Sequence, residues 1–226
     1  MKKTRNTFNK KTIILLLVYI ATISNSFSQQ NNAKKLLDDV SSKMTSYTNM
    51  VIAFSTSLSN ADADIKEGDE APILGNVILE GEKYNLNYLG SNYIFDRKKL
   101  YVINHDEQEI VINDGDFEED DGFIYPSKLL TFYKEGYNYK LGKLITKKGV
   151  KIQYVELTPI DSNSEITKVH LGIDLKKNHI YSLIQTGANG AITTLIITSL
   201  KSNQELPKTT FVLDKEAYLK KNYIID

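Results

Sequence analysis

The 226-residue chain contains no cysteine. This absence excludes disulfide bonds, thiolate nucleophiles and cysteine-based zinc or iron–sulfur sites. It also leaves no thiol for lipid attachment near the N-terminus. The three histidines, His105, His170 and His179, lie too far apart in the sequence for a metal-binding spacing, and we expect His105 and His170 to be solvated surface residues. We therefore expect neither a metal nor another cofactor.

Catalytic motifs and an excess of positive charge are also missing. The sequence has no Gly-x-Ser-x-Gly turn to expose a serine and no glycine-rich loop to cradle phosphate. Of the 28 basic and 28 acidic residues, five basic residues and no acidic residue lie in 1–28, so residues 29–226 carry 23 − 28 = −5. Neutralising phosphates requires clustered Lys and Arg, so we expect no nucleic-acid partner, and we do not expect an enzyme.

Only one long apolar run is present, at residues 13–20. Five basic residues precede it, and Ser26-Phe27-Ser28-Gln29 follows it. This order is typical of a secretory signal, and the run is too short to cross about 30 Å of hydrocarbon. We expect residues 1–28 to be a signal peptide and residues 29–226 to form one soluble domain in a bacterial periplasm, since no Pro/Gly/Ser-rich linker divides them.

Hydrophobic periodicity predicts an α+β fold that is mostly β. Apolar residues recur at helical spacing from Ala33 to Tyr47, which predicts an N-terminal helix over 33–47. Beyond Tyr47 the period changes to two, and short gaps separate about eleven strands. Such gaps favour antiparallel hairpins in a meander, and Asn189-Gly190 predicts a type I′ turn.

Several predicted strands are apolar on both faces, at residues 100–103, 180–184 and 192–200. A sheet with one solvated face would not need this, so both faces must be covered. The pattern favours a curled sheet with an apolar concave side, covered by the helix at 33–47 or by residues 126–133, where Pro126 suits a first helical turn. A sandwich whose core is filled by its own side chains fits the periodicity equally well.

The densest charge lies in residues 114–122, which include Glu118, Glu119, Asp120 and Asp121. The spacing does not match the calcium-binding EF-hand loop. A solvated acidic loop is one interpretation. The other is a docking surface for a basic partner, because apolar and aromatic residues follow at 123–125.

The order of short motifs resembles the LolA-type outer-membrane lipoprotein carriers, in particular their divergent relatives of the Bacteroidetes type. The similarity covers 29–226. The motifs are an Ala-x-x-Leu-Leu-x-x-Val helix from Ala33, a strand beginning near Phe54, Gly75 at the opening of a strand, Tyr93-Ile94-Phe95-Asp96 before Lys98-Lys99-Leu100-Tyr101, residues 126–139, and Phe211-Val212-Leu213-Asp214.

The resemblance implies a half-open antiparallel β-barrel of the LolA/LppX type, with an N-terminal helix and short lid helices across its mouth. It also implies a monomeric periplasmic carrier of triacylated or diacylated lipoproteins. Such a carrier receives acyl chains from an inner-membrane lipoprotein-releasing ABC transporter and passes them to an outer-membrane acceptor, which stays unidentified here. The family's barrel arginine, which holds the lids closed, is absent from Glu80-Gly81-Glu82-Lys83, where Lys83 is a partial substitute.

Alternation and helix faces predict the residues that would line an acyl-binding interior. They are Phe54, Val77, Leu79, Tyr84, Leu86, Tyr88, Leu129, Phe132, Tyr133, Leu171 and Ile173. Two alternatives stay open. One is an envelope-stress sensor of the same fold that binds lipoprotein acyl chains, and the other is a small-ligand or structural β-protein with a filled core.

Overall fold

The computed structural model describes residues 31–115, 126 and 128–226. Residues 31–45 form the N-terminal helix. The remaining helical elements are short: η1 (Ala61–Ala63), η2 (Phe132–Lys134) and α2 (Lys215–Leu219). The strands are β1 (Met50–Asn60), β2 (Ile73–Glu80), β3 (Lys83–Tyr88), β4 (Ser91–Phe95), β5 (Lys99–Asn104), β6 (Glu109–Asp114), β7 (Tyr137–Lys147), β8 (Val150–Pro159), β9 (Ile166–Asp174), β10 (His179–Gly187), β11 (Ala191–Ser202) and β12 (Ile224–Ile225).

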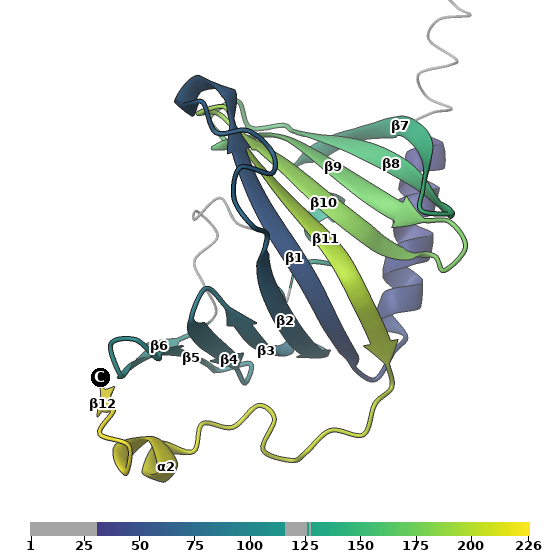
Figure 1. Ribbon diagram of the computed structural model, residues 1–226. Helices are drawn as coiled ribbons and strands as arrows, with labels where there is room; N and C mark the ends of the chain where they lie inside the picture. Colours follow the sequence, from purple (N-terminus) through teal and green to yellow (C-terminus); the bar gives the residue numbers. More distant parts are fainter. Residues whose placement is uncertain (1–30, 116–125, 127) are drawn as a thin grey trace, which may run out of the picture.

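All of these strands belong to one curved sheet in the order β12-β6-β5-β4-β3-β2-β1-β11-β10-β9-β8-β7. Every neighbouring pair is antiparallel except β12 and β6, which run parallel. The central pair joins Met50 to Ser202 and Asn60 to Ala191, so the first and last long strands lie side by side. The sheet does not close: β7 and the β6–β12 pair form its two edges, and Figure 1 shows the two halves splayed apart. The predicted mostly β fold with antiparallel hairpins is confirmed.

The inner face of the sheet is covered by the N-terminal helix. Its buried residues are spaced three and four apart, namely Ala33, Leu37, Val40 and Met44, and they pack into one cluster with strands from both halves of the sheet. The helix lies across β7–β10 in Figure 1. It ends at residue 45, two residues before the predicted end, and Tyr47 follows in an irregular turn.

The outer face of β2–β6 is covered by the C-terminal segment, residues 203–226. A second cluster joins Ile94, Ile103 and Ile110 of the sheet to Phe211 of this segment, with Tyr218 and other apolar residues packed around them. Figure 1 shows the segment running below β2–β6 to α2 and β12. The segment therefore explains why strands such as β5 are apolar on both faces.

Two predictions of local structure are wrong. In the predicted lid at 126–133, the described residues 126 and 128–133 form no α-helix: they lie in turns that lead into the 3-10 helix η2. The Asn189-Gly190 turn is not type I′, because only Gly190 has positive φ (77°) and Gly190 N–H donates to the Gly187 carbonyl, giving a three-residue loop. The type I′ pattern of two positive φ angles occurs instead at Leu89-Gly90 (52° and 76°) and at Lys148-Gly149 (49° and 79°).

Candidate functional site

The candidate site is the apolar interior between the inner sheet face, the N-terminal helix and residues 128–134. Successive strands contribute alternate residues to it because side chains of a strand point to opposite faces. All eleven predicted lining residues belong to this one cluster. Eight of them are buried and three are partly buried: Phe54, Val77, Leu79, Tyr84, Leu86, Tyr133, Leu171 and Ile173, then Tyr88, Leu129 and Phe132. Their role in acyl binding stays a prediction.

An aromatic group in β1 and β3 shapes one wall of the interior. The Phe54 ring lies over Gly75, its direct cross-strand partner, where an added Cβ would stand 2.4 Å from the Phe54 Cζ atom. The centroids of the Phe54 and Tyr88 rings are 5.6 Å apart, and the Tyr88 hydroxyl is 2.7 Å from Thr56 Oγ1. Gly75 therefore gives Phe54 the space to lie flat against the sheet and contact Tyr88.

Residues 128–134 form a cover over the interior, which we call the cover segment. Leu129, Leu130 and Phe132 pack against the inner cluster, and Tyr133 is 3% exposed. The Tyr133 hydroxyl donates a 2.9 Å hydrogen bond to Asp38 Oδ1 of the N-terminal helix. Burial, together with this carboxylate, raises the pKa of Tyr133 to about 12, so the phenol stays neutral and donates.

A cavity of about 460 Å³ lies where the C-terminal end of the helix meets the cover segment. Its lining comes from the end of the helix and the residues that follow it, the start of β1, the ends of β2 and β4, the β2–β3 turn, Pro126 and the cover segment. The lining residues are Met44, Thr45, Tyr47, Asn49, Met50, Leu79, Gly81, Glu82, Phe95, Pro126, Lys128, Leu130 and Thr131. Of the predicted lining residues, Leu79 borders this cavity. The sequence pattern alone did not indicate Met44, Met50, Phe95 or Leu130 as its walls, although their apolar character was visible.

Two of the histidines are half-buried, which corrects the expectation of a solvated His170. Burial lowers the pKa of His170. Burial, and then the charges of Lys43 and Lys177, lower the pKa of His179. His179 Nε2 lies 2.7 Å from the Tyr47 hydroxyl, a contact that ties the chain after the helix to the start of β10.

Lys83 does not replace the family's barrel arginine. It alternates with the inward residue Tyr84, so it lies on the outer face. There it pairs with Glu80, and its Nζ atom is 4.7 Å from the centroid of the Phe211 ring. A lysine on that face cannot reach the cover segment. The Tyr133–Asp38 hydrogen bond makes the link between cover and helix instead.

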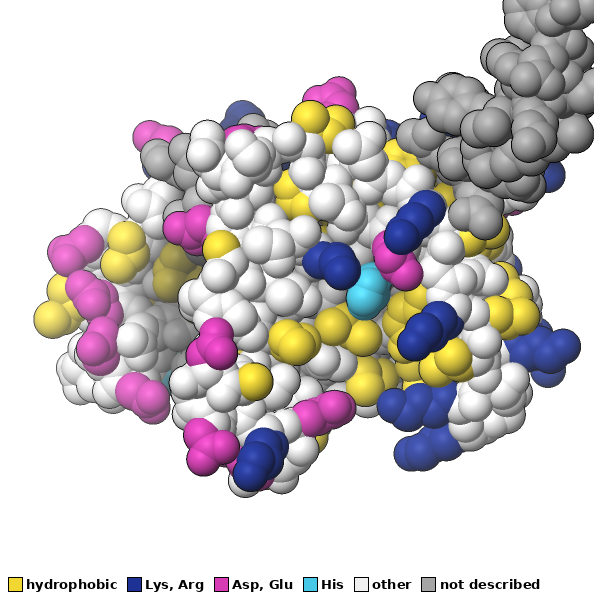
Figure 2. Space-filling model, turned by 90° about the horizontal axis from the view of Figure 1, so that it is seen from above, with side chains coloured by type: hydrophobic (Ala, Val, Ile, Leu, Met, Phe, Trp, Pro, Cys, Tyr) yellow, Lys and Arg dark blue, Asp and Glu magenta, His cyan; other side chains and the backbone are white. Residues whose placement is uncertain are grey.

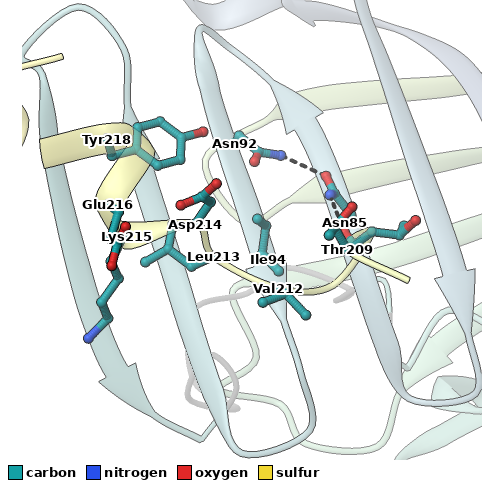
Figure 3. Close-up of a pocket in the computed structure, with 11 residues that line it drawn as sticks. Asn85, Asn92, Ile94, Thr209, Val212, Leu213, Asp214, Lys215, Glu216 and Tyr218 are labelled. Atoms are coloured by element: carbon teal, nitrogen blue, oxygen red, sulfur yellow. Dashed lines mark hydrogen bonds between the residues drawn. The ribbon is translucent and has the colours of Figure 1, made fainter. Parts of the chain in front are cut away.

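A second hollow, of about 700 Å³, lies on the outer face beneath α2 (Figure 3). Asn92 donates a 2.8 Å hydrogen bond to the Asn85 side chain, and Asn85 donates one of 2.6 Å to the Thr210 carbonyl. Asp214 and Glu216 also border it. These amide and carboxylate groups make the hollow a poor setting for hydrocarbon.

The predicted partner-binding residues Glu118, Glu119, Asp120 and Asp121 lie outside the described residues. Across the described part of the chain, no helix has the length and apolar character required to cross a membrane.

The sequence matches no protein-family model and no curated protein. The fold is similar to that of an uncharacterized conserved protein from Thermus thermophilus, with a TM-score of 0.57 at 10% identity over 86% of this chain and 98% of that one. Two further similar structures are a LolA superfamily protein from Nitrosomonas europaea (TM-score 0.43, 12% identity, 80% and 98% covered) and a putative outer membrane lipoprotein-sorting protein domain from Vibrio parahaemolyticus (TM-score 0.40, 14% identity, 82% and 99% covered). At identities of 10–14%, these similarities concern the fold alone.

Proposed function

We propose that the protein is a divergent LolA-like carrier that shields the acyl chains of lipoproteins in its apolar interior while they cross the periplasm. In this role it would take lipoproteins from an inner-membrane ABC transporter and deliver them towards the outer membrane. The observation that carries the proposal is an inner apolar face, built by both halves of an open sheet, with a cavity beneath a cover that is not continuous with the sheet.

The energetics favour a binding protein over free diffusion of the cargo. Burying one methylene is worth about 0.8 kcal/mol, so a chain of about 15 methylenes left in water costs about 12 kcal/mol. Transfer from a bilayer into an apolar cavity exchanges one hydrocarbon setting for another, so it needs neither catalysis nor a nucleotide bound to this chain. A volume of about 460 Å³ lies in the range of about 300–1,000 Å³ that is usual for small-ligand pockets.

The cover segment supplies the movement that loading requires. Its attachment to the helix includes the hydrogen bond from Tyr133 to Asp38 and the packing of Leu129, Leu130 and Phe132. Asp38 also pairs with Lys34, and its side chain is 41% exposed, so water competes for this bond. Displacing the cover would join the cavity to the apolar cluster beneath it.

The test combines native ligand recovery with a matched pair of variants. Mass spectrometry of protein purified from the periplasm is expected to find bound lipoprotein or fatty-acyl ligand. A fluorescent fatty-acid probe should bind the wild type, and Leu130→Gln should weaken this binding about tenfold, because a leucine contact with hydrocarbon is worth about 1.5 kcal/mol. Leu144→Gln is the control, because Leu144 in β7 is 59% exposed, belongs to neither apolar cluster and does not border the cavity.

Equal loss of probe binding in both variants would show that the probe does not bind in the cavity. Ligand-free native protein that also fails to bind the probe would overturn the carrier proposal and favour a filled-core β-protein.

A further inference from the structure

Six lysines gather at one end of the β7–β10 half of the sheet, and we call this cluster the basic end. Lys147, Lys148 and Lys151 flank the β7–β8 turn, Lys176 and Lys177 lie in the β9–β10 turn, and Lys43 lies in the N-terminal helix. All six are exposed. Two contacts hold the parts together: Lys43 Nζ donates to the Lys177 carbonyl at 2.7 Å, and Leu175 N–H donates to the Lys151 carbonyl at 3.0 Å.

Among the described residues, the lysines of the basic end have no ion-pair partner. Asp174 lies below them but is 6% exposed, and its carboxylate accepts the backbone N–H groups of Lys176 and Lys177. Lys43 and Lys177 act together on His179, whose pKa they help to lower. The lysines therefore face solvent as one field of like charge.

The opposite end of the sheet is acidic. The loops at 61–72, 105–108 and 160–165 together carry nine acidic residues and one lysine, Lys66. In Figure 2 the Lys and Arg side chains gather on the right and most Asp and Glu side chains on the left. This separation gives the protein an electrostatic axis along its strands, which orients it against a charged surface before contact.

The cavity lies at the same end of the sheet as the basic end. Met50 starts β1 and pairs with Ser202, and Glu80 ends β2 before the Gly81-Glu82 turn that borders the cavity. The neighbouring β2–β6 half carries both signs here, with Glu80, Glu82 and Asp96 against Lys83, Arg97 and Lys98. Leu175 is 41% exposed in the centre of the lysines, where it offers an apolar contact next to the charge.

We propose that the basic end docks the protein on an anionic phospholipid surface. Clustered lysines are attracted to anionic headgroups, Leu175 reaches the interface between them, and the acidic end faces away. This deepens the proposed function, because it would bring the cavity mouth to the membrane from which acyl chains are taken or to which they are delivered. The docking itself needs no acyl ligand, so the two proposals fail separately.

The test measures co-sedimentation of the exported protein with vesicles made of equal parts phosphatidylglycerol and phosphatidylcholine, and with phosphatidylcholine alone. The wild type should bind the anionic vesicles only, and it should dissociate near 1 M salt, where the Debye length is about 3 Å. The variant Lys147→Gln/Lys148→Gln/Lys176→Gln/Lys177→Gln should bind at least about a hundredfold more weakly, since each lysine near such a surface contributes about fivefold and four together contribute up to about 600-fold.

The control variant removes four exposed lysines at the opposite end of the sheet, Lys66→Gln/Lys168→Gln/Lys220→Gln/Lys221→Gln. It has the same net charge as the first variant and should lose less than about fivefold. Equal losses in the two variants, or no binding of the wild type to anionic vesicles, would overturn the proposal. Binding of the wild type to immobilised polyglutamate but not to vesicles would also overturn it and identify an acidic protein as the partner. Melting curves of both variants verify that they fold.

Discussion

The Tyr133 hydroxyl donates to the Asp38 carboxylate across 2.9 Å, and this bond joins the cover segment to the N-terminal helix. The two residues are 95 positions apart in the chain. Their contact places the segment that connects the two sheet edges over the inner apolar face. The pair is one polar link between cover and helix, and opening the cover as proposed above would break it.

Replacing Tyr133 with Phe should loosen the cover. Removing one hydrogen bond to a partly exposed carboxylate is expected to lower the free energy of unfolding by about 1 kcal/mol. The same change should speed uptake of the fatty-acid probe in stopped-flow measurements, because the closed cover loses its link to the helix. Tyr181→Phe, in β10 and away from the cover, is the control and should alter neither quantity. Unchanged uptake in Tyr133→Phe would show that opening involves another part of the molecule.

Alkaline pH should act through the same residue. Because the pKa of folded Tyr133 is raised to about 12, the unfolded chain, with its ordinary tyrosine pKa of about 10, ionises first. The stabilisation is therefore complete below pH 10 and is lost as pH rises from about 10 to 12. Urea unfolding across this range should show a smaller decline for Tyr133→Phe than for the wild type. Parallel declines would contradict the assignment of this titration to Tyr133.

Mild acid should weaken the contact between the helix end and β10. The pKa of His179 is lowered by burial and then by Lys43 and Lys177, so below its ordinary pKa of about 6.5 the unfolded chain binds the proton more readily. Stability present above pH 6.5 is then lost as the pH falls towards the lowered value. His179→Gln should lose less in Tm between pH 7.5 and 5.5 than the wild type does. An identical loss would mean that other groups cause the acid sensitivity.

Gly75 should not tolerate a side chain. An alanine Cβ would stand 2.4 Å from the Phe54 ring, and displacing this ring is expected to cost about 1–3 kcal/mol. Combining Gly75→Ala with Phe54→Leu should cost less than the sum of the two changes, because the shorter side chain relieves the clash. Asn76→Ala, at the exposed neighbouring position, should stay within about 0.5 kcal/mol of the wild type in chemical denaturation. Additive costs would show that the ring moves freely.

Phe211→Ala should separate stability from binding. Phe211 is 8% exposed in the outer cluster, so its truncation is expected to cost about 3 kcal/mol. The inner cluster lies on the other face of the sheet, and affinity for the fatty-acid probe should therefore be unchanged at temperatures where the variant is folded. A large loss of affinity in the folded variant would link the outer cover to the interior.

Much of the fold follows from the local pattern of apolar and polar residues along the sequence. Alternation marks Tyr84 and Leu86 as inward and Lys83 and Asn85 as outward, and the structure places them so, because a strand must turn every second side chain to each face. For the same reason the eight predicted lining residues that lie in strands meet in one cluster. The residue types in a turn predicted its conformation less reliably. Both Lys148 and Gly149 have positive φ, whereas Gly190 has positive φ and Asn189 does not. The difference depends on the geometry of the two strands that each turn connects.

Which segments cover the two faces of the sheet, and which strands pair, depends on contacts between parts of the chain that are distant in sequence. Periodicity identifies β5 as apolar on both faces, but it does not reveal that residues 203–226 return to cover one of them. The pairing of β1 with β11, the Tyr133–Asp38 bond and the cavity between helix and cover segment each join parts of the chain that are far apart in sequence. The physical reason is that hydrophobicity specifies which side chains leave water but not which surface receives them, since burial is non-directional and only packing selects the partner.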